Sequence, residues 1–295
     1  MSRQYYYFIA GLPSISLDDN KLVYTPEQFR EEAISQLSAD DYALIELLHL
    51  PEDIQNLLLA LYQKKDKTPN PEGLKSQEAW QEYLDYLRQK AENQHLPTPV
   101  AFQGLPPFIA QILCPTLIEE ELPDLQDLEH KLLSAFYNFT KNHSNEFISA
   151  FFELERNIKN ILTAINGRNH EIDFAPYLIG EDETVTNLSK SHADDFGLGK
   201  EHPLFDQVSR IWEQNNILDR ERGYDNLRHK WIDEQNFFEY FNINRILGYY
   251  SKVRIINRWI KADADMGKEV FHDTLNKLEN SFEFPEDFNI KIKHS

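Results

Sequence analysis

Apolar residues recur at spacings of three and four along most of the sequence, and this is the period at which one face of an α-helix is lined. The segment from Asp124 to Asn142 is the clearest example of this spacing. Strand-like alternation is confined to Tyr5–Leu12 and Phe288–Ile292, and the first of these also fits the start of a buried helix. We therefore predict an all-α fold of multi-helix bundle lobes with at most short terminal strands.

Capping residues mark where several of the predicted helices begin and end. Thr25, Pro26 and Gln28 form a capping box with proline at the first helical position. A long amphipathic pattern starts after Asn145 and is followed by Gly167. Because glycine is common just past the last residue of a helix, we predict that Gly167 ends this helix.

Polar stretches rich in proline separate the helical segments. Lys64–Lys75 and Leu96–Pro107 are predicted loops, and residues 168–202 form an irregular region with one expected helix at Glu183–Lys190. Later helices are expected at Asp225–Phe238, Asn242–Lys261 and Gly267–Phe282. We predict one helical unit over residues 1–295, with lobes 1–123 and 124–295 as a further division that the pattern leaves open.

Charge balance and scarce glycine exclude several classes of function. The sequence has 30 Lys and Arg against 49 Asp and Glu, and its formal net charge of −19 disfavours binding to nucleic-acid phosphates. Its ten glycines form none of the GxGxxG, GxxxxGK[ST] or GxSxG motifs of nucleotide-binding folds and hydrolases. The apolar run Tyr5–Leu12 is far shorter than the ~20 residues that span a bilayer. We expect a cytoplasmic protein with no nucleic-acid partner, no membrane insertion and no cofactor.

One basic stripe contrasts with this negative charge. Residues 245–261 contain five basic side chains and no acidic one. At about 100° per residue, Arg254, Arg258 and Lys261 fall on one side of a helix. The stripe is interpreted either as a docking surface for an acidic partner or as a surface that pairs with the chain's own acidic helices, and the second is the commoner arrangement of charged side chains.

A polar loop holds the candidate metal ligands His192, Asp194, Asp195 and His202. Imidazole and carboxylate groups suit zinc or iron, so a metal-dependent helical hydrolase that uses this loop is one alternative function. Spacings within a loop impose no geometry, however, and no motif such as HExxH completes the set. A solvated acidic loop is therefore the favoured interpretation. The single cysteine, Cys114, lies in an apolar stretch and is interpreted as a small core residue.

Two segments resemble helices of a known family. Residues 152–163, with Asn160-Ile161 and Thr163 followed by the basic Arg168, resemble a helix of the C/d subunit of V-type and archaeal-type rotary ATPases. Residues 252–258 resemble the equivalent helix near the C-terminus of that family, although the acidic residue of the family pattern is absent there. These two helices carry the whole of the resemblance to the C/d subunits themselves.

The opening segment carries a second resemblance. Tyr5–Pro13, followed by Asp18-Asp19, is similar to a bacterial family of uncharacterised proteins, and this similarity extends over the full chain. Members of that family are typically encoded beside V-type ATPase genes and have been interpreted as divergent C/d subunits.

The resemblance implies a mechanical role. A C/d subunit is a funnel-shaped helical protein that is seated on the membrane rotor ring, receives the central shaft, and binds no nucleotide. The expected function is therefore that of a non-catalytic subunit that couples the rotor ring to the central shaft of a V-type ATPase, held at the inner face of the membrane by these partners. A helical adaptor for an unrelated protein is the remaining alternative.

Overall fold

The computed structural model describes residues 5–64, 66–199 and 202–263, and these residues form helices, turns and loops without any strand. The all-α prediction is confirmed. The first six α-helices are α1 (Tyr6–Ala10), α2 (Pro26–Gln36), α3 (Ala39–Leu47), α4 (Leu50–Leu61), α5 (Gln77–Glu92) and α6 (Pro107–Thr116). The later ones are α7 (Leu125–Lys141), α8 (Glu146–Asn169), α9 (Glu183–Lys190), α10 (Pro203–Trp212), α11 (Ile217–Gln235) and α12 (Ile243–Asp263). Two short 3₁₀ turns are η1 (Val100–Phe102) and η2 (Ala175–Tyr177).

The helix starts that depend on local capping are confirmed. The Thr25 hydroxyl accepts a hydrogen bond from the Gln28 backbone N–H at 3.3 Å, and the Gln28 side-chain oxygen accepts from the Thr25 N–H at 3.0 Å. Asn145 caps α8 by accepting from the Ile148 N–H. The predicted helix Glu183–Lys190 is α9, with Asp182 as its N-cap.

Other predictions are wrong or concern residues outside the described structure. The strand alternative for Tyr5–Leu12 is wrong, because Tyr6–Ala10 is helical. α11 starts at Ile217, eight residues before the predicted Asp225. No helix is predicted where α6 lies. α6 begins at Pro107, which is the last residue of the predicted loop Leu96–Pro107. The segments predicted at 267–282 and 288–292 lie outside the described residues.

Gly167 does not end α8, which continues through it to Asn169. Phe174 folds back over this point of the helix. A Cβ atom at position 167 would lie 2.5 Å from the Phe174 Cβ, which is closer than two non-bonded carbon atoms approach each other. Glycine is thus required here by the close approach of a side chain, and the capping interpretation is wrong.

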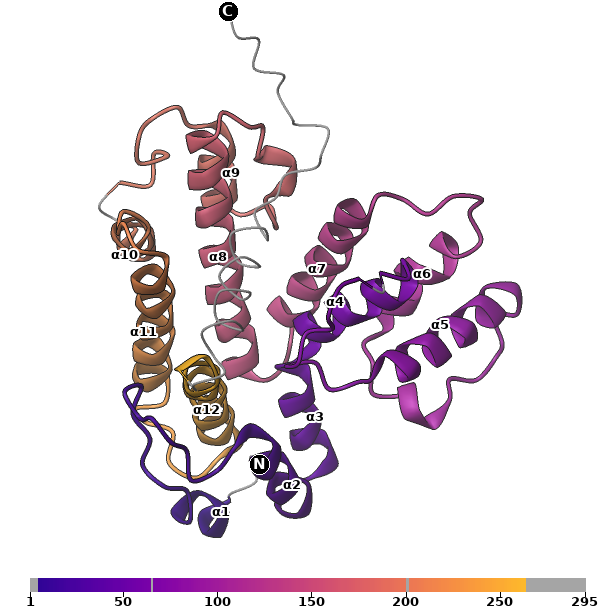
Figure 1. Cartoon of the computed structure of the whole chain (residues 1–295), viewed down its shortest axis with the longest axis horizontal. Helices are drawn as coiled ribbons and strands as arrows, with labels where there is room; N and C mark the ends of the chain where they lie inside the picture. Colours follow the sequence, from indigo (N-terminus) through magenta and orange to yellow (C-terminus); the bar gives the residue numbers. More distant parts are fainter. Residues whose placement is uncertain (1–4, 65, 200–201, 264–295) are drawn as a thin grey trace, which may run out of the picture.

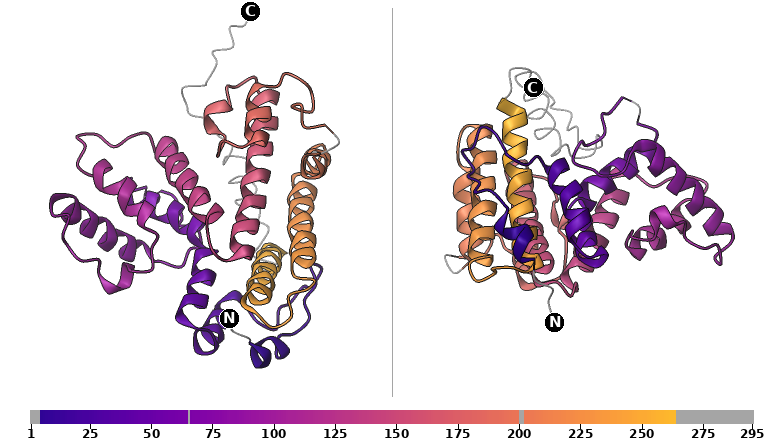
Figure 2. Two further views of the ribbon diagram at one scale, coloured as in Figure 1. Left: turned by 180° about the vertical axis from the view of Figure 1, so that it is seen from behind. Right: turned by 90° about the horizontal axis from the view of Figure 1, so that it is seen from below.

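The helices lie in two groups joined at their base (Figure 1). α4 to α7 form one group and α8 to α12 form the other. α1 and α2 lie below α12, and α3 stands beside α12 and leads up to α4, as the reverse view also shows (Figure 2). α12 packs against α2, α3, α8 and α11, and α4 packs against α7. The largest cluster of buried apolar residues contains residues from before and after the predicted lobe boundary at 123/124. The division into two lobes stays a prediction. Among the described helices, none has the length and apolar character that crossing a bilayer would need.

A buried polar network ties α2, the start of α4 and α12 together around Tyr250. Tyr250 is fully buried and stacks on Phe29 with ring centroids 5.0 Å apart. Arg30 Nη1 donates to the Tyr250 hydroxyl at 2.8 Å, and His49 Nε2 lies 2.6 Å from the same oxygen. His49 Nδ1 is 2.6 Å from the carbonyl of Glu72.

Only one arrangement of protons satisfies this network. The Glu72 carbonyl can only accept, so His49 Nδ1 carries the imidazole proton and donates it there. Nε2 of the neutral ring is then an acceptor, so the Tyr250 hydroxyl donates to it while the Tyr250 oxygen accepts from Arg30. Burial, reinforced by Arg254, lowers the pKa of His49 to about 2, so the ring stays neutral at physiological pH.

We expect His49 to make the fold sensitive to mild acid. Below pH 6.5 the unfolded chain protonates this imidazole while the folded chain does not, so stability falls as pH falls. Between pH 7.5 and pH 5.5 the free energy of unfolding should fall by about 1.4 kcal/mol more in the wild type than in His49→Gln, as measured by urea unfolding. His95→Gln, at an exposed histidine, is the control and should keep the wild-type slope. Equal pH dependence of His49→Gln and the wild type would contradict the assignment.

Candidate functional site

The first residue of the basic stripe, Arg254, points into the protein. Its Nη1 donates to the Leu48 carbonyl at 2.6 Å and its Nη2 to Glu52 Oε1 at 2.9 Å. Its Nε lies 3.6 Å from Glu72 Oε2. Only 14 % of the side chain is exposed, so Arg254 joins α12 to the junction between α3 and α4.

The other two residues of the stripe lie progressively nearer to solvent. Arg258 pairs with Asp225 and lies 3.7 Å from Glu221 Oε2. Lys261 is half exposed and lies 3.9 Å from Glu27 and 4.0 Å from Glu72. All three stripe residues therefore pair with carboxylates of the chain itself. Docking of a partner on the exposed parts of Arg258 and Lys261 stays a prediction.

Asp225 is the centre of a charge network that crosses three helices. Its side chain is 2 % exposed, and it accepts hydrogen bonds from Arg228 Nη1 at 3.2 Å, from Arg258, and from the Trp259 indole N–H at 2.7 Å. Arg228 in turn holds both oxygens of Glu155, with Nε–Oε1 at 2.6 Å and Nη2–Oε2 at 3.0 Å. The charge network of Glu155, Arg228, Asp225 and Arg258 thus links α8, α11 and α12.

The electrostatics of this network keep Arg228 charged. Burial lowers the pKa of the Arg228 guanidinium, but Glu155, helped by Asp225 and Glu221, outweighs burial and raises it overall. Burial also raises the pKa of Glu221, and the nearby arginines only partly oppose this effect. Bidentate pairing of a guanidinium with a carboxylate is both strong and strict in geometry. The network therefore fixes the positions of the three helices relative to one another.

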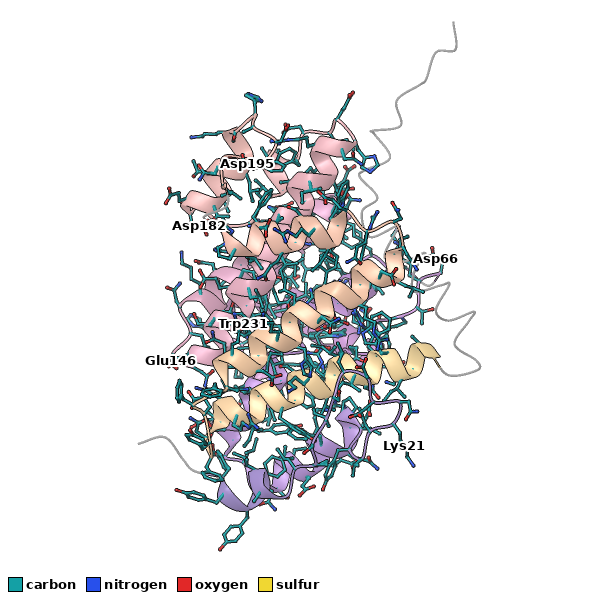
Figure 3. All side chains as sticks on the ribbon, turned by 90° about the vertical axis from the view of Figure 1, so that its left-hand side faces the viewer. Lys21, Asp66, Glu146, Asp182, Asp195 and Trp231 are labelled. Atoms are coloured by element: carbon teal, nitrogen blue, oxygen red, sulfur yellow. The ribbon has the colours of Figure 1, made fainter. Side chains whose placement is uncertain are left out.

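The residues of α8 that carry the family resemblance also face inward. Asn160 is buried and exchanges two hydrogen bonds with the backbone of Ile179, at 2.8 and 2.9 Å. Arg156 is 7 % exposed in its side chain and donates to Asp182 Oδ2 at 2.5 Å (Asp182 is labelled in Figure 3). These two side chains hold the segment that leads into α9 against the middle of α8.

The candidate metal ligands are engaged in local turns. His202 caps α10 by accepting from the Phe205 N–H at 3.2 Å, and Asp195 accepts from the Gly197 N–H at 2.9 Å (Figure 3). The Asp194 carbonyl faces Arg168, and His192 is exposed. Across the described residues, no group of three or more His, Cys, Asp or Glu side chains is placed to hold a metal ion.

The cysteine and the tryptophans pack as core or core-edge residues. Cys114 is half-buried, and burial raises the pKa of its thiol, which opposes thiolate formation. Trp259 is 8 % exposed beneath α11. Trp231 lies against Phe147 and Phe151 with ring centroids 6.1 and 6.0 Å apart (Figure 3).

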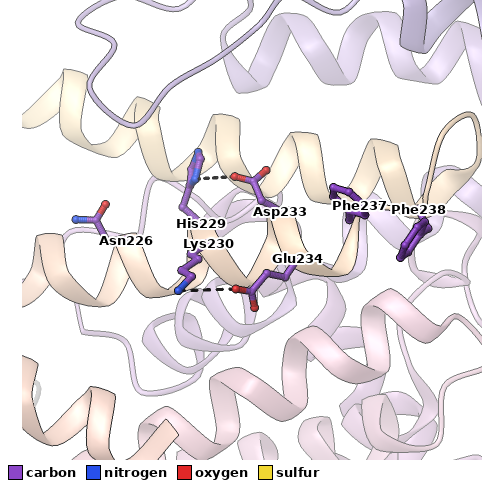
Figure 4. A pocket seen from close by; sticks show the side chains of 7 residues that line it. All are labelled: Asn226, His229, Lys230, Asp233, Glu234, Phe237 and Phe238. Carbon is purple, nitrogen blue, oxygen red and sulfur yellow. Dashed lines mark ion pairs between the residues drawn. The ribbon is translucent and has the colours of Figure 1, made fainter. Parts of the chain in front are cut away.

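Sequence reasoning missed an aromatic surface at one end of the molecule. Six aromatic side chains from α1 and the loop between α11 and α12 stand exposed, and we call them the aromatic end surface: Tyr6, Tyr7, Phe237, Phe238, Tyr240 and Phe241. A shallow, open pocket of about 590 Å³, lined by one face of α11 and the loop after it, reaches Phe237 and Phe238 (Figure 4). Four aromatic residues among five consecutive positions, 237–241, were the available signal in the sequence.

We expect Glu155 and Arg228 to show strong coupling in a double-mutant cycle. Each single change to Gln should cost about 1.5–3 kcal/mol, because it removes the bidentate partner of a largely buried charge. The double variant should lose about 1–3 kcal/mol less than the sum of the single changes, as measured by urea unfolding. The control is the exposed pair Lys230 and Glu234, which lies on α11 together with Arg228. Its coupling free energy should be less than about 0.5 kcal/mol. Equal coupling in the two pairs would contradict the network.

Reversing the charge of Arg254 should also destabilise the fold. Arg254→Glu would face Glu52 and Glu72 in a largely buried site, so we expect a loss of more than about 3 kcal/mol. Arg245→Glu changes an exposed residue of the same helix and should alter stability by less than about 0.5 kcal/mol. Thermal unfolding followed by circular dichroism measures both. A stable Arg254→Glu variant would show that this residue is free to serve a partner.

Comparison with known proteins gives one result. A family model described as "Protein of unknown function (DUF2764)" matches residues 1–282. No curated protein and no solved structure matches the chain. The match extends from the first helix, through the charge network of α8, α11 and α12, and past the last described residue. The chain therefore belongs to the DUF2764 family of proteins of unknown function.

Proposed function

We propose that this chain is a non-catalytic subunit of a V-type ATPase, which couples the membrane rotor ring to the central shaft. The sequence resemblance to C/d subunits lies in α8 and α12. These same helices carry Glu155 and Arg258, the two ends of the charge network. The proposal places the protein at the inner face of the cell membrane, held there through its partner subunits.

The charge network is the observation that carries the proposal. A subunit that transmits torque must resist sliding of its helices, and apolar packing alone resists sliding poorly because it has little directional preference. A buried bidentate pair has a strict geometry, and breaking it costs several kcal/mol. In this chain one bidentate pair, Arg228 with Glu155, connects α8 and α11, and contacts of Asp225 with Arg258 and Trp259 connect α11 and α12. Arg254 connects α12 to α4 through Glu52.

A second candidate function is that of an adaptor for an unrelated protein, and the aromatic end surface favours it. Contiguous exposed aromatic residues are typical of protein interfaces. This surface also suits a rotary ATPase subunit, which must bind at least two partners. The identity of the bound proteins therefore separates the two candidate functions.

Native co-purification tests the proposal. We expect the tagged chain, extracted from its own cells in a detergent that keeps membrane complexes intact, to recover rotor-ring and central-shaft subunits identified by mass spectrometry. An untagged strain is the control for adventitious recovery. Recovery of a different, stoichiometric partner without any ATPase subunit would favour the adaptor, and absence of all ATPase subunits would contradict the proposal.

A further inference from the structure

We draw no further inference here: the strongest candidate, the aromatic end surface that α1 and the loop between α11 and α12 present to solvent, is an unpartnered apolar patch, and nothing in the structure shows what covers it.

Discussion

One buried carboxylate sets the arrangement of the later helices. Asp225 is almost fully withdrawn from water, yet two guanidinium groups and an indole N–H converge on it. An unpaired carboxylate at this depth would cost several kcal/mol, so α11 and α12 are stable only in the register that brings these donors together. α8 joins them through Glu155, which holds Arg228. Sliding one helix by a single turn, about 5.4 Å, would separate the charges. Apolar packing holds the helices together, and the contacts of Asp225 determine how α11 and α12 are aligned along their axes.

α8 and α12 place an aromatic residue and an arginine in the same way. In α8, Phe152 is buried and Arg156 follows it by one turn to pair with Asp182. In α12, Tyr250 is buried and Arg254 follows it at the same spacing to pair with Glu52. In both helices an aromatic ring anchors one turn in the core, and the next turn places a guanidinium group at the edge of that core.

Local signals predicted much of the fold, and long-range contacts account for the rest. The capping box of α2 and the bounds of α9 depend on neighbouring residues, so the sequence pattern alone identified them. Gly167 was misinterpreted because its role depends on Phe174, which folds back from beyond the helix. The basic stripe was found, but its partners were not, because no periodicity links Arg254 to Glu52, some two hundred residues earlier. Exposure of the aromatic rings at 237–241 likewise depends on which face the neighbouring helices leave open.

The contact between α2 and α12 also bears on the order in which the chain acquires structure during synthesis. Arg30 and Tyr250 are 220 residues apart, and His49 and Tyr250 are 201 residues apart. α2 and the start of α4 are therefore synthesised long before Tyr250, and their hydrogen bonds to it can form only when most of the chain has been made. At ribosomal rates of roughly 5–20 residues per second, this interval is on the order of ten to forty seconds, during which Phe29 has no Tyr250 to cover it. The face of α2 that Tyr250 covers is therefore left uncovered until most of the chain has been made.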